Sequence, residues 1–308
     1  MLGGFLVGLS FNGGCMLPVL LMAPAILRRA WIAIGFALAV PGAILIAWNV
    51  PGKFNYATDS KWVVFATLVP FITGGILALA LPVRDLWRHR DAEAVVLCAW
   101  VYGTFIFAAI LNWTVNGRSV LPLVPALAIL IARAMDERGE SESRFSWRVA
   151  LPVAASLVVS LWLAAADMSL AGSAREMAHL VMQRTESMEG KVFFSGHWGF
   201  QYYMQELGAR PLDLAHQELT TNDILVQPTN NSNTFGIPAN AVASREEIEI
   251  DGNWWISPMR RELGAAFYSS FGFGPLPFAW GRILPEKSII FRLKAEESGQ
   301  EIDSRRPK

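Results

Sequence analysis

Two short stretches of the sequence carry side chains whose types and spacing fit ligand binding. Arg118 lies between two apolar runs, in Asn116-Gly117-Arg118-Ser119. A guanidinium at such a point either extends to the lipid headgroups or holds a phosphate with its planar fork of donors. His197 and Gln201 are four residues apart in a segment that favours a helix, so they would share one helical face. For His197, a ligand contact and an ordinary capped turn are both open readings.

Residues that would supply catalysis or a metal site are scarce. Asp59 is the one acidic residue in the connections expected outside the membrane, and a lone loop carboxylate is more often solvated than catalytic. The sequence shows no phosphate-loop, paired-histidine or nucleophile-elbow motif. We therefore predict no catalytic residue, no metal ligand and no cofactor. The histidines, no two of which have helical ligand spacing, are His89, His179, His197 and His216.

The composition separates two parts of the chain. Of 308 residues, 53% are hydrophobic and 17% are charged, whereas ordinary soluble proteins carry about 25% charged residues. Residues 1–168 hold 12 Lys/Arg and 9 Asp/Glu, and residues 169–308 hold 14 and 17. The net charge of zero is thus +3 in one part and −3 in the other, so we expect no nucleic-acid partner. Cys15 and Cys98 lie in apolar runs, and no disulfide framework is predicted.

The first part, residues 1–168, is predicted to be a transmembrane helical domain of about six spans. Four of its charge-free runs exceed the ~20 residues that cross the hydrocarbon layer. The fifth run is short and needs flanking residues to extend it. Asn12-Gly13-Gly14 interrupts the first run, which predicts a kinked or broken helix. The runs are Met1–Leu27, Ala30–Val50, Trp62–Val83, Ala94–Gly117, Ser119–Ala132 and Val149–Ala166.

The distribution of basic residues in the connections predicts the orientation, because cytoplasmic loops carry the excess of Lys and Arg. Alternate connections, at residues 28–29, 84–90 and 133–148, hold nine of them, and the others hold Lys53, Lys61 and Arg118. We therefore expect the nine in the cytoplasm, and both the N-terminus and the C-terminal domain outside. Lys53 and Lys61 are then expected to be interfacial anchors.

Residues 169–308 are predicted to form a small extracytoplasmic α/β domain with a charged tail after Ala295. An exported domain without cysteine is compatible with a bacterial periplasm. Trp254-Trp255 and Phe271–Trp280 are aromatic loops that either rest on the membrane surface or form core. Predicted helices cover Ser173–Met188 and Trp198–Leu207, and predicted strands cover Lys191–Ser195, Ile224–Gln227, Glu246–Ile250 and Ser288–Leu293.

Three segments together resemble bacterial polytopic glycosyltransferases of the GT-C type. Asn116–Leu127, with its Leu-Pro and Pro-Ala-Leu pairs, resembles the arginine-containing span of the dolichyl-phosphate-mannose protein mannosyltransferase and aminoarabinose transferase kind. Leu2–Ser10 looks like the Gly-Leu-rich span that lies mid-chain in that family. Gly190–Tyr203 resembles the start of the exported domain in a bacterial branch. The resemblance covers most of the chain.

The resemblance implies transfer of a sugar from a polyprenyl-phosphate carrier to an acceptor at the outer face of the bacterial inner membrane. The partners would be the lipid-linked sugar and membrane lipid. In the family, basic residues hold the lipid phosphate and an acidic residue of an early external loop acts as the base. The chain begins at the Gly-Leu-rich span, so this acidic loop is missing, and Asn12-Gly13 replaces the usual threonine-lysine. Only the phosphate role transfers, to Arg118.

We therefore expect the C-terminal part of such a glycosyltransferase, with a substrate-binding site that draws on Arg118, Asn116, His197 and Gln201. The alternative is a non-enzymatic membrane protein whose exported domain binds a partner or scaffolds an assembly. The absence of a convincing acid and base pair in the sequence is what keeps this alternative open.

Overall fold

The chain divides into two compact units in the computed structural model, which describes residues 2–48, 61–137, 147–213, 219–220, 222–232, 234–252 and 255–294. The first, helical unit combines Met1–Asp167 with Trp254–Ile283, and the second combines Met168–Asn253 with Leu284–Lys308. We expected residues 169–308 to form one domain. The structure instead groups residues 255–283, here called the returning segment, with the helices. The charged tail lies outside the described residues.

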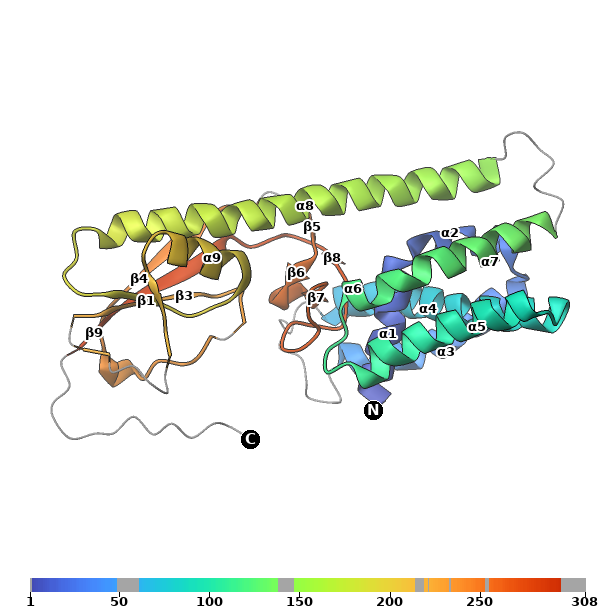
Figure 1. Ribbon diagram of the computed structural model, residues 1–308, viewed down its shortest axis with the longest axis horizontal. Helices are drawn as coiled ribbons and strands as arrows, with labels where there is room; N and C mark the ends of the chain where they lie inside the picture. Colours follow the sequence, from blue (N-terminus) through green and yellow to red (C-terminus); the bar gives the residue numbers. More distant parts are fainter. Residues whose placement is uncertain are drawn as a thin grey trace. The chain divides into compact units, whose positions relative to one another are not determined.

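Among the described residues, five helices are long and apolar enough to cross a membrane, and a sixth span is present if one bent pair counts as a single span. Helices α3, α4, α5 and α7 run side by side (Figure 1). The helices are α1 (Leu2–Cys15), α2 (Leu17–Ile26), α3 (Arg29–Ala47), α4 (Lys61–His89), α5 (Ala92–Ile106) with its π-helical end η2 (Phe107–Leu111), α6 (Gly117–Val120), η3 (Leu121–Leu123), α7 (Val124–Asp136) and α8 (Trp147–Thr185).

The predicted break in the first run is confirmed, although it falls slightly later in the chain. α1 and α2 meet at an angle of 76°. Met16 separates them and Pro18 lies in the first turn of α2, where a missing amide hydrogen costs nothing. Just before the bend, the Gly13 region of α1 packs directly on α4. A Cβ atom on Gly13 would overlap the carbonyl oxygen of Phe71.

Helix α8 is longer than the sequence predicted. We expected a span at Val149–Ala166 and a separate helix at Ser173–Met188, but the structure has one helix of 39 residues. The stretch between them contains no proline, and its Ala and Leu residues favour a helix. The change in composition at Asp167 therefore marks the boundary between the two units, which falls inside α8, and not the end of a helix.

The second unit is built on a five-stranded sheet in the order β2-β1-β3-β9-β4. β1 pairs in parallel with β2 and β3, and β9 pairs antiparallel with β3 and β4. All four predicted strands and the helix predicted at Trp198–Leu207 are confirmed. The elements are β1 (Val192–Phe194), α9 (Trp198–Glu206), β2 (Arg210–Pro211), β3 (Ile224–Pro228), β4 (Val242–Ile250) and β9 (Glu286–Leu293).

Apolar side chains cover both faces of this sheet. On one face, Met177 and Val181 of α8 and Phe200 of α9 pack with Phe194 and Val226 of the strands. On the other face, the cluster contains Phe193, Leu225 and Phe291. Successive strand residues point to opposite faces, so Phe193 and Phe194 serve the two cores in turn. The centre of the sheet is thus buried on both sides, as the fully buried strand β3 shows, whereas the edge strands β2 and β4 are largely exposed.

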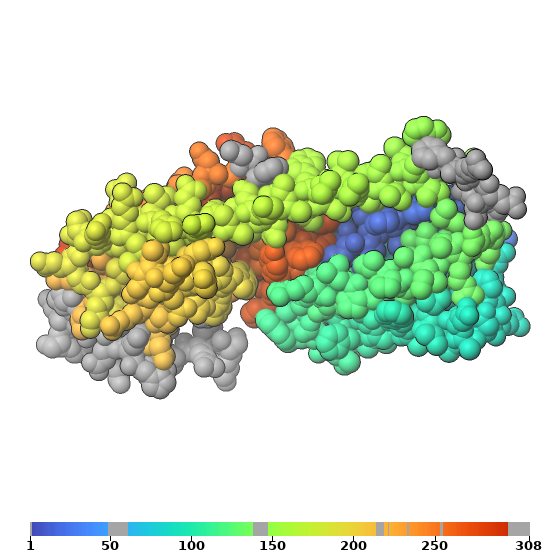
Figure 2. Space-filling view, turned by 45° about the horizontal axis from the view of Figure 1, so that its top comes forward, coloured from blue at the N-terminus to red at the C-terminus, as the bar shows by residue number. Residues whose placement is uncertain are grey.

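The returning segment forms short strands that pack on the helical unit: β5 (Ile256–Ser257), β6 (Met259–Arg260), β7 (Ala265–Ala266) and β8 (Ala279–Trp280). The rings of Phe278 and Trp280 lie with their centroids 5.0 and 6.0 Å from that of Phe71 in α4. In the space-filling view this orange-red segment lies directly against the blue N-terminal helices (Figure 2). The core reading of the aromatic loops is thus confirmed for Phe278, whereas Phe271 is exposed.

Exposed tryptophans mark both ends of the helical unit. In α4, Trp62 and Trp87 are 25 residues apart, or ~37 Å along a helix. This distance exceeds the ~30 Å hydrocarbon layer and reaches into the headgroup regions. Tryptophan prefers this interfacial layer, so the pattern is consistent with a unit that crosses a membrane. The other exposed tryptophans at helix ends are Trp31, Trp48, Trp113 and Trp147.

The crossing of α1 and α4 makes a prediction with a matched control. A Cβ atom on Gly75 would overlap the carbonyl oxygen of Leu9, and a backbone atom cannot move aside as a side chain can. We expect Gly75→Ala to lower the free energy of unfolding by about 1–3 kcal/mol. Gly103 of α5 has nothing within 4 Å of an added Cβ atom. Gly103→Ala should therefore be neutral or stabilising by up to ~1 kcal/mol.

Thermal unfolding of the purified chain in one detergent compares the two variants. A midpoint for Gly75→Ala at or above that of the unsubstituted chain would show that α1 and α4 do not touch through their backbones.

Candidate functional site

Arg118 stands at the start of α6, and the returning segment helps to fix its backbone. The side-chain oxygen of Asn116 accepts a hydrogen bond of 2.9 Å from the amide of Ser119, so Asn116 caps this helix. The amide of Gly117 donates to the carbonyl of Phe267 at 2.7 Å. A Cβ atom on Gly117 would overlap the Phe267 ring, so a larger residue here would have to displace this ring. Arg118 thus has a defined place at the end of the apolar stretch Gly117–Asp136.

The Arg118 side chain is exposed, and its partner is an aromatic ring. Its guanidinium carbon lies 5.7 Å from the centroid of the Tyr268 ring, within the range of a cation–π interaction. The Tyr268 hydroxyl donates to the two carboxylate oxygens of Asp167 at 2.7 and 2.6 Å. Among the described residues, Arg118 has no carboxylate within ion-pair distance. Within the described part of the chain, no carboxylate therefore occupies its donors.

The protonation of Tyr268 supports this arrangement. Burial raises the pKa of its hydroxyl well above the ordinary value, and the hydrogen bond to Asp167 and the charge of that carboxylate raise it further. The nearby Arg118 opposes the shift. Tyr268 consequently stays a neutral hydrogen-bond donor at physiological pH. The ring keeps its ordinary electron-rich face for Arg118, while the hydroxyl engages Asp167, the negative group nearest to Tyr268.

His197 and Gln201 belong to the second unit, and the structure brings their side chains together. His197 Nδ1 lies 3.2 Å from Gln201 Oε1. Asn231 holds the turn from both sides, since its side-chain oxygen accepts from the His197 amide at 2.8 Å and its Nδ2 donates to the His197 carbonyl at 3.2 Å. The imidazole is exposed. The pair forms a small polar site whose backbone is fixed by Asn231.

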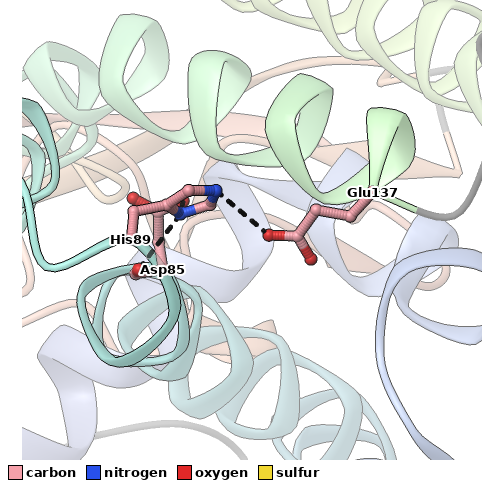
Figure 3. Close-up of side chains that lie close together, drawn as sticks. All are labelled: Asp85, His89 and Glu137. Carbon is pink, nitrogen blue, oxygen red and sulfur yellow. Dashed lines mark hydrogen bonds and ion pairs between the residues drawn. The ribbon is translucent and has the colours of Figure 1, made fainter.

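A third cluster joins the C-terminal ends of α4 and α7, shown in Figure 3. His89 Nδ1 lies 3.1 Å from Asp85 Oδ1, and His89 Nε2 lies 3.5 Å from Glu137 Oε1. Asp85 is only 3% exposed. The three side chains offer ligand atoms within 4.8 Å of one another, a spacing that suits a metal ion.

Arginines already neutralise the carboxylates of this cluster. Arg84 lies 2.5 Å from Glu137, and Arg88 pairs with the same carboxylate. Arg133 lies 3.3 Å from Asp85 Oδ2. A cation would have to displace these guanidinium groups, so the side chains fit an ion-pair network between α4 and α7 better than a metal centre.

Sequence reasoning found Arg118, Asn116, His197 and Gln201 but missed Tyr268, Asp167 and the Asp85 cluster as a group. Asp85 and His89 are four residues apart in an apolar helix, a spacing that places them on one helical face and that the sequence shows directly. Tyr268 lies 150 residues beyond Arg118 in the chain, and no local pattern connects the two. Lys53 and Asp59 lie outside the described residues.

Comparisons with known proteins leave the function to be inferred from these side chains. No family model, curated protein or solved structure matches the chain. Of the three groups, the Arg118 site alone has an exposed cation that no described carboxylate pairs, and this cation lies at the end of an apolar helical stretch. It is therefore the best candidate for a functional site.

The ion-pair network predicts unequal roles for two of its arginines. Arg133→Met would leave the buried Asp85 carboxylate without its guanidinium partner, so we expect a loss of about 3–5 kcal/mol in the free energy of unfolding. The Arg88 side chain is 54% exposed, and Arg84 still pairs with Glu137 when Arg88 is replaced. Arg88→Met should cost less than about 1 kcal/mol.

Unfolding of both variants in the same detergent, followed by circular dichroism, measures the difference. Equal losses for Arg88→Met and Arg133→Met would contradict the assignment of Asp85 as a buried charge that depends on Arg133.

Proposed function

We propose that this protein acts in glycosyl transfer from a polyprenyl-phosphate carrier, and that Arg118 holds the phosphate of the carrier. The observation that carries the proposal is the exposed Arg118 guanidinium, which has an aromatic support and no ion-pair partner among the described residues. It stands at the end of the apolar stretch Gly117–Asp136. A lipid with a long apolar chain and a phosphate head needs this combination of an apolar helix surface and a cation at its end.

Transfer of the sugar creates negative charge on the phosphate, which the Arg118 guanidinium can stabilise. The bond between the sugar and the phosphate oxygen breaks, the acceptor oxygen bonds to the sugar, and the phosphate leaves with additional negative charge. The proton of the acceptor hydroxyl passes to water or to the released phosphate. A guanidinium placed at that oxygen stabilises the developing charge and holds the phosphate through two donors at once. His197 and Gln201 belong to the second unit, and their role in substrate binding stays a prediction of the sequence.

An interfacial arginine without a carrier site would contact any anionic lipid. A carrier site differs because it selects the polyprenyl monophosphate over ordinary phospholipids. Selectivity in binding, and not binding alone, is therefore the property that supports the proposal.

Replacement of Arg118 tests the phosphate role directly. The full chain in nanodiscs of neutral phosphatidylcholine is titrated with undecaprenyl phosphate, and bound lipid is measured by native mass spectrometry. Loss of a hydrogen-bonded charge pair costs about 1.5–3 kcal/mol, so we expect Arg118→Ala to weaken binding roughly ten- to a hundredfold. Arg118→Lys should recover part of the affinity, because it keeps the charge but not the fork.

Arg282→Ala is the matched control. Arg282 is an exposed arginine of the returning segment, and its loss should leave binding unchanged. Equal binding by Arg118→Ala and the unsubstituted chain would refute the phosphate role. Equal affinity for undecaprenyl phosphate and phosphatidylglycerol would show ordinary headgroup anchoring and favour the non-enzymatic alternative.

Two substitutions of Tyr268 distinguish whether its ring or its hydroxyl group positions Arg118. Tyr268→Phe keeps the face beneath Arg118 and removes the donor to Asp167, so carrier binding should fall no more than a few-fold. Tyr268→Ala removes both contacts and should approach the loss seen for Arg118→Ala. The same titration measures both variants. A loss for Tyr268→Phe as large as that for Tyr268→Ala would show that the hydroxyl, and not the ring, positions Arg118.

A further inference from the structure

Two aromatic side chains from distant parts of the chain meet on the surface of the helical unit. Trp113 is 79% exposed and Phe271 is 74% exposed. Their ring centroids are 6.2 Å apart with an interplanar angle of 61°. Trp113 lies two residues after the end of η2, and Phe271 lies in the returning segment. Neither residue has a role in the phosphate site proposed above.

The backbone holds this aromatic pair in place. The Ser270 amide donates to the carbonyl of Val115 at 2.9 Å, and the Val115 amide donates to the Ser270 hydroxyl at 3.1 Å. The Phe271 amide donates to the Thr114 hydroxyl at 3.3 Å. These hydrogen bonds join residues 114–115 to residues 270–271, directly beside the two rings. The exposure of the rings is a property of the fold and not of a loose loop.

The turn after Phe271 directs neighbouring aromatic residues in opposite directions. Gly272 has a φ of +75°, a conformation that glycine adopts without strain. Phe273, just beyond it, is fully buried. The segment thus turns Phe273 into the core and leaves Phe271 on the surface. A fold that buries one phenylalanine and displays another two residues away presents the second to a partner.

The surroundings of the pair identify that partner as lipid. Leu111, the last residue of η2, is also exposed, and Ile110 and Phe107 of the same helix expose their side chains too. The pair therefore continues the exposed apolar surface of a helix long enough to cross a membrane. Tryptophan at such a helix end is typical of the membrane interface.

We propose that Trp113 and Phe271 form an interfacial anchor that inserts into the lipid leaflet at the end of the helical unit that carries Arg118. The partner is the layer of glycerol and upper acyl chains, where aromatic rings with one apolar face are favoured. The anchor fixes the returning segment on the membrane through Phe271. It requires only that the helices cross a bilayer, and it holds whether or not Arg118 binds a polyprenyl carrier.

Site-specific photocrosslinking tests the anchor in the full chain. Benzoylphenylalanine replaces Phe271 in protein reconstituted into vesicles of phosphatidylcholine and phosphatidylglycerol, and adducts are identified by mass spectrometry after irradiation. The same residue at Leu161, an exposed apolar position of α8, is the lipid-facing standard. At Glu247, an exposed position of β4, it is the water-facing standard. Trp113 is replaced in a second variant as an independent reading of the same anchor.

We expect lipid adducts at positions 271 and 113 within about threefold of the yield at 161, and at least tenfold above the yield at 247. Lipid yields at both positions equal to that at 247 would overturn the anchor. Adducts at 271 and 113 that are mainly to protein, including a second copy of the chain, would also overturn it. Both replaced residues are exposed, and an unchanged melting temperature shows that each variant is folded.

Discussion

The hydrogen bond from the Gly117 amide to the Phe267 carbonyl ties together the features on which the candidate site depends. It joins the first turn of α6 to a segment that lies 150 residues further along the chain. With this contact in place, Tyr268 lies beneath Arg118 and donates to Asp167. The next residues of the same segment, 269–271, pair with residues 114 and 115. The exposed guanidinium and the exposed aromatic pair are therefore set by one junction between distant parts of the chain.

The returning segment also packs on α4, where α1 and α4 approach each other closely. Gly13 and Gly75 let α1 approach α4 until their backbones touch, and Phe71 of α4 then receives the rings of Phe278 and Trp280. Small residues at helix crossings are the usual means of association where lipid removes the hydrophobic driving force between helices. The same packing encloses Asn12 completely, with neither side-chain polar atom hydrogen-bonded within the described chain. Contact area thus outweighs the desolvation of one amide at this crossing.

Local patterns in the sequence predicted most of the elements and little of their assembly. Runs of apolar residues located the long helices, and short β-branched and aromatic runs located four strands within a few residues. Each of these depends on neighbours in the chain. The grouping of residues 255–283 with the helices depends on long-range contacts such as Phe71 with Phe278, which no periodicity records. The same holds for the site, since Arg118 was evident from its setting between apolar runs while Tyr268 was not.

Arginine has two opposite roles in the helical unit, and the difference comes from its partners. At the junction of α4 and α7, Arg133 faces a carboxylate that is almost fully buried, and other guanidinium groups engage Glu137. Asp85 and Glu137 each have cationic partners within the protein, so the network can hold two helices together but has little affinity left for a ligand. At the start of α6, the nearest carboxylate to Tyr268 is already engaged by its hydroxyl. Arg118 receives the face of a ring in place of a counter-charge, and its donors stay available. A guanidinium that rests on an aromatic ring and has no carboxylate partner is suited to bind an anionic ligand. The apolar helix that follows Arg118 favours an anion carried by a lipid.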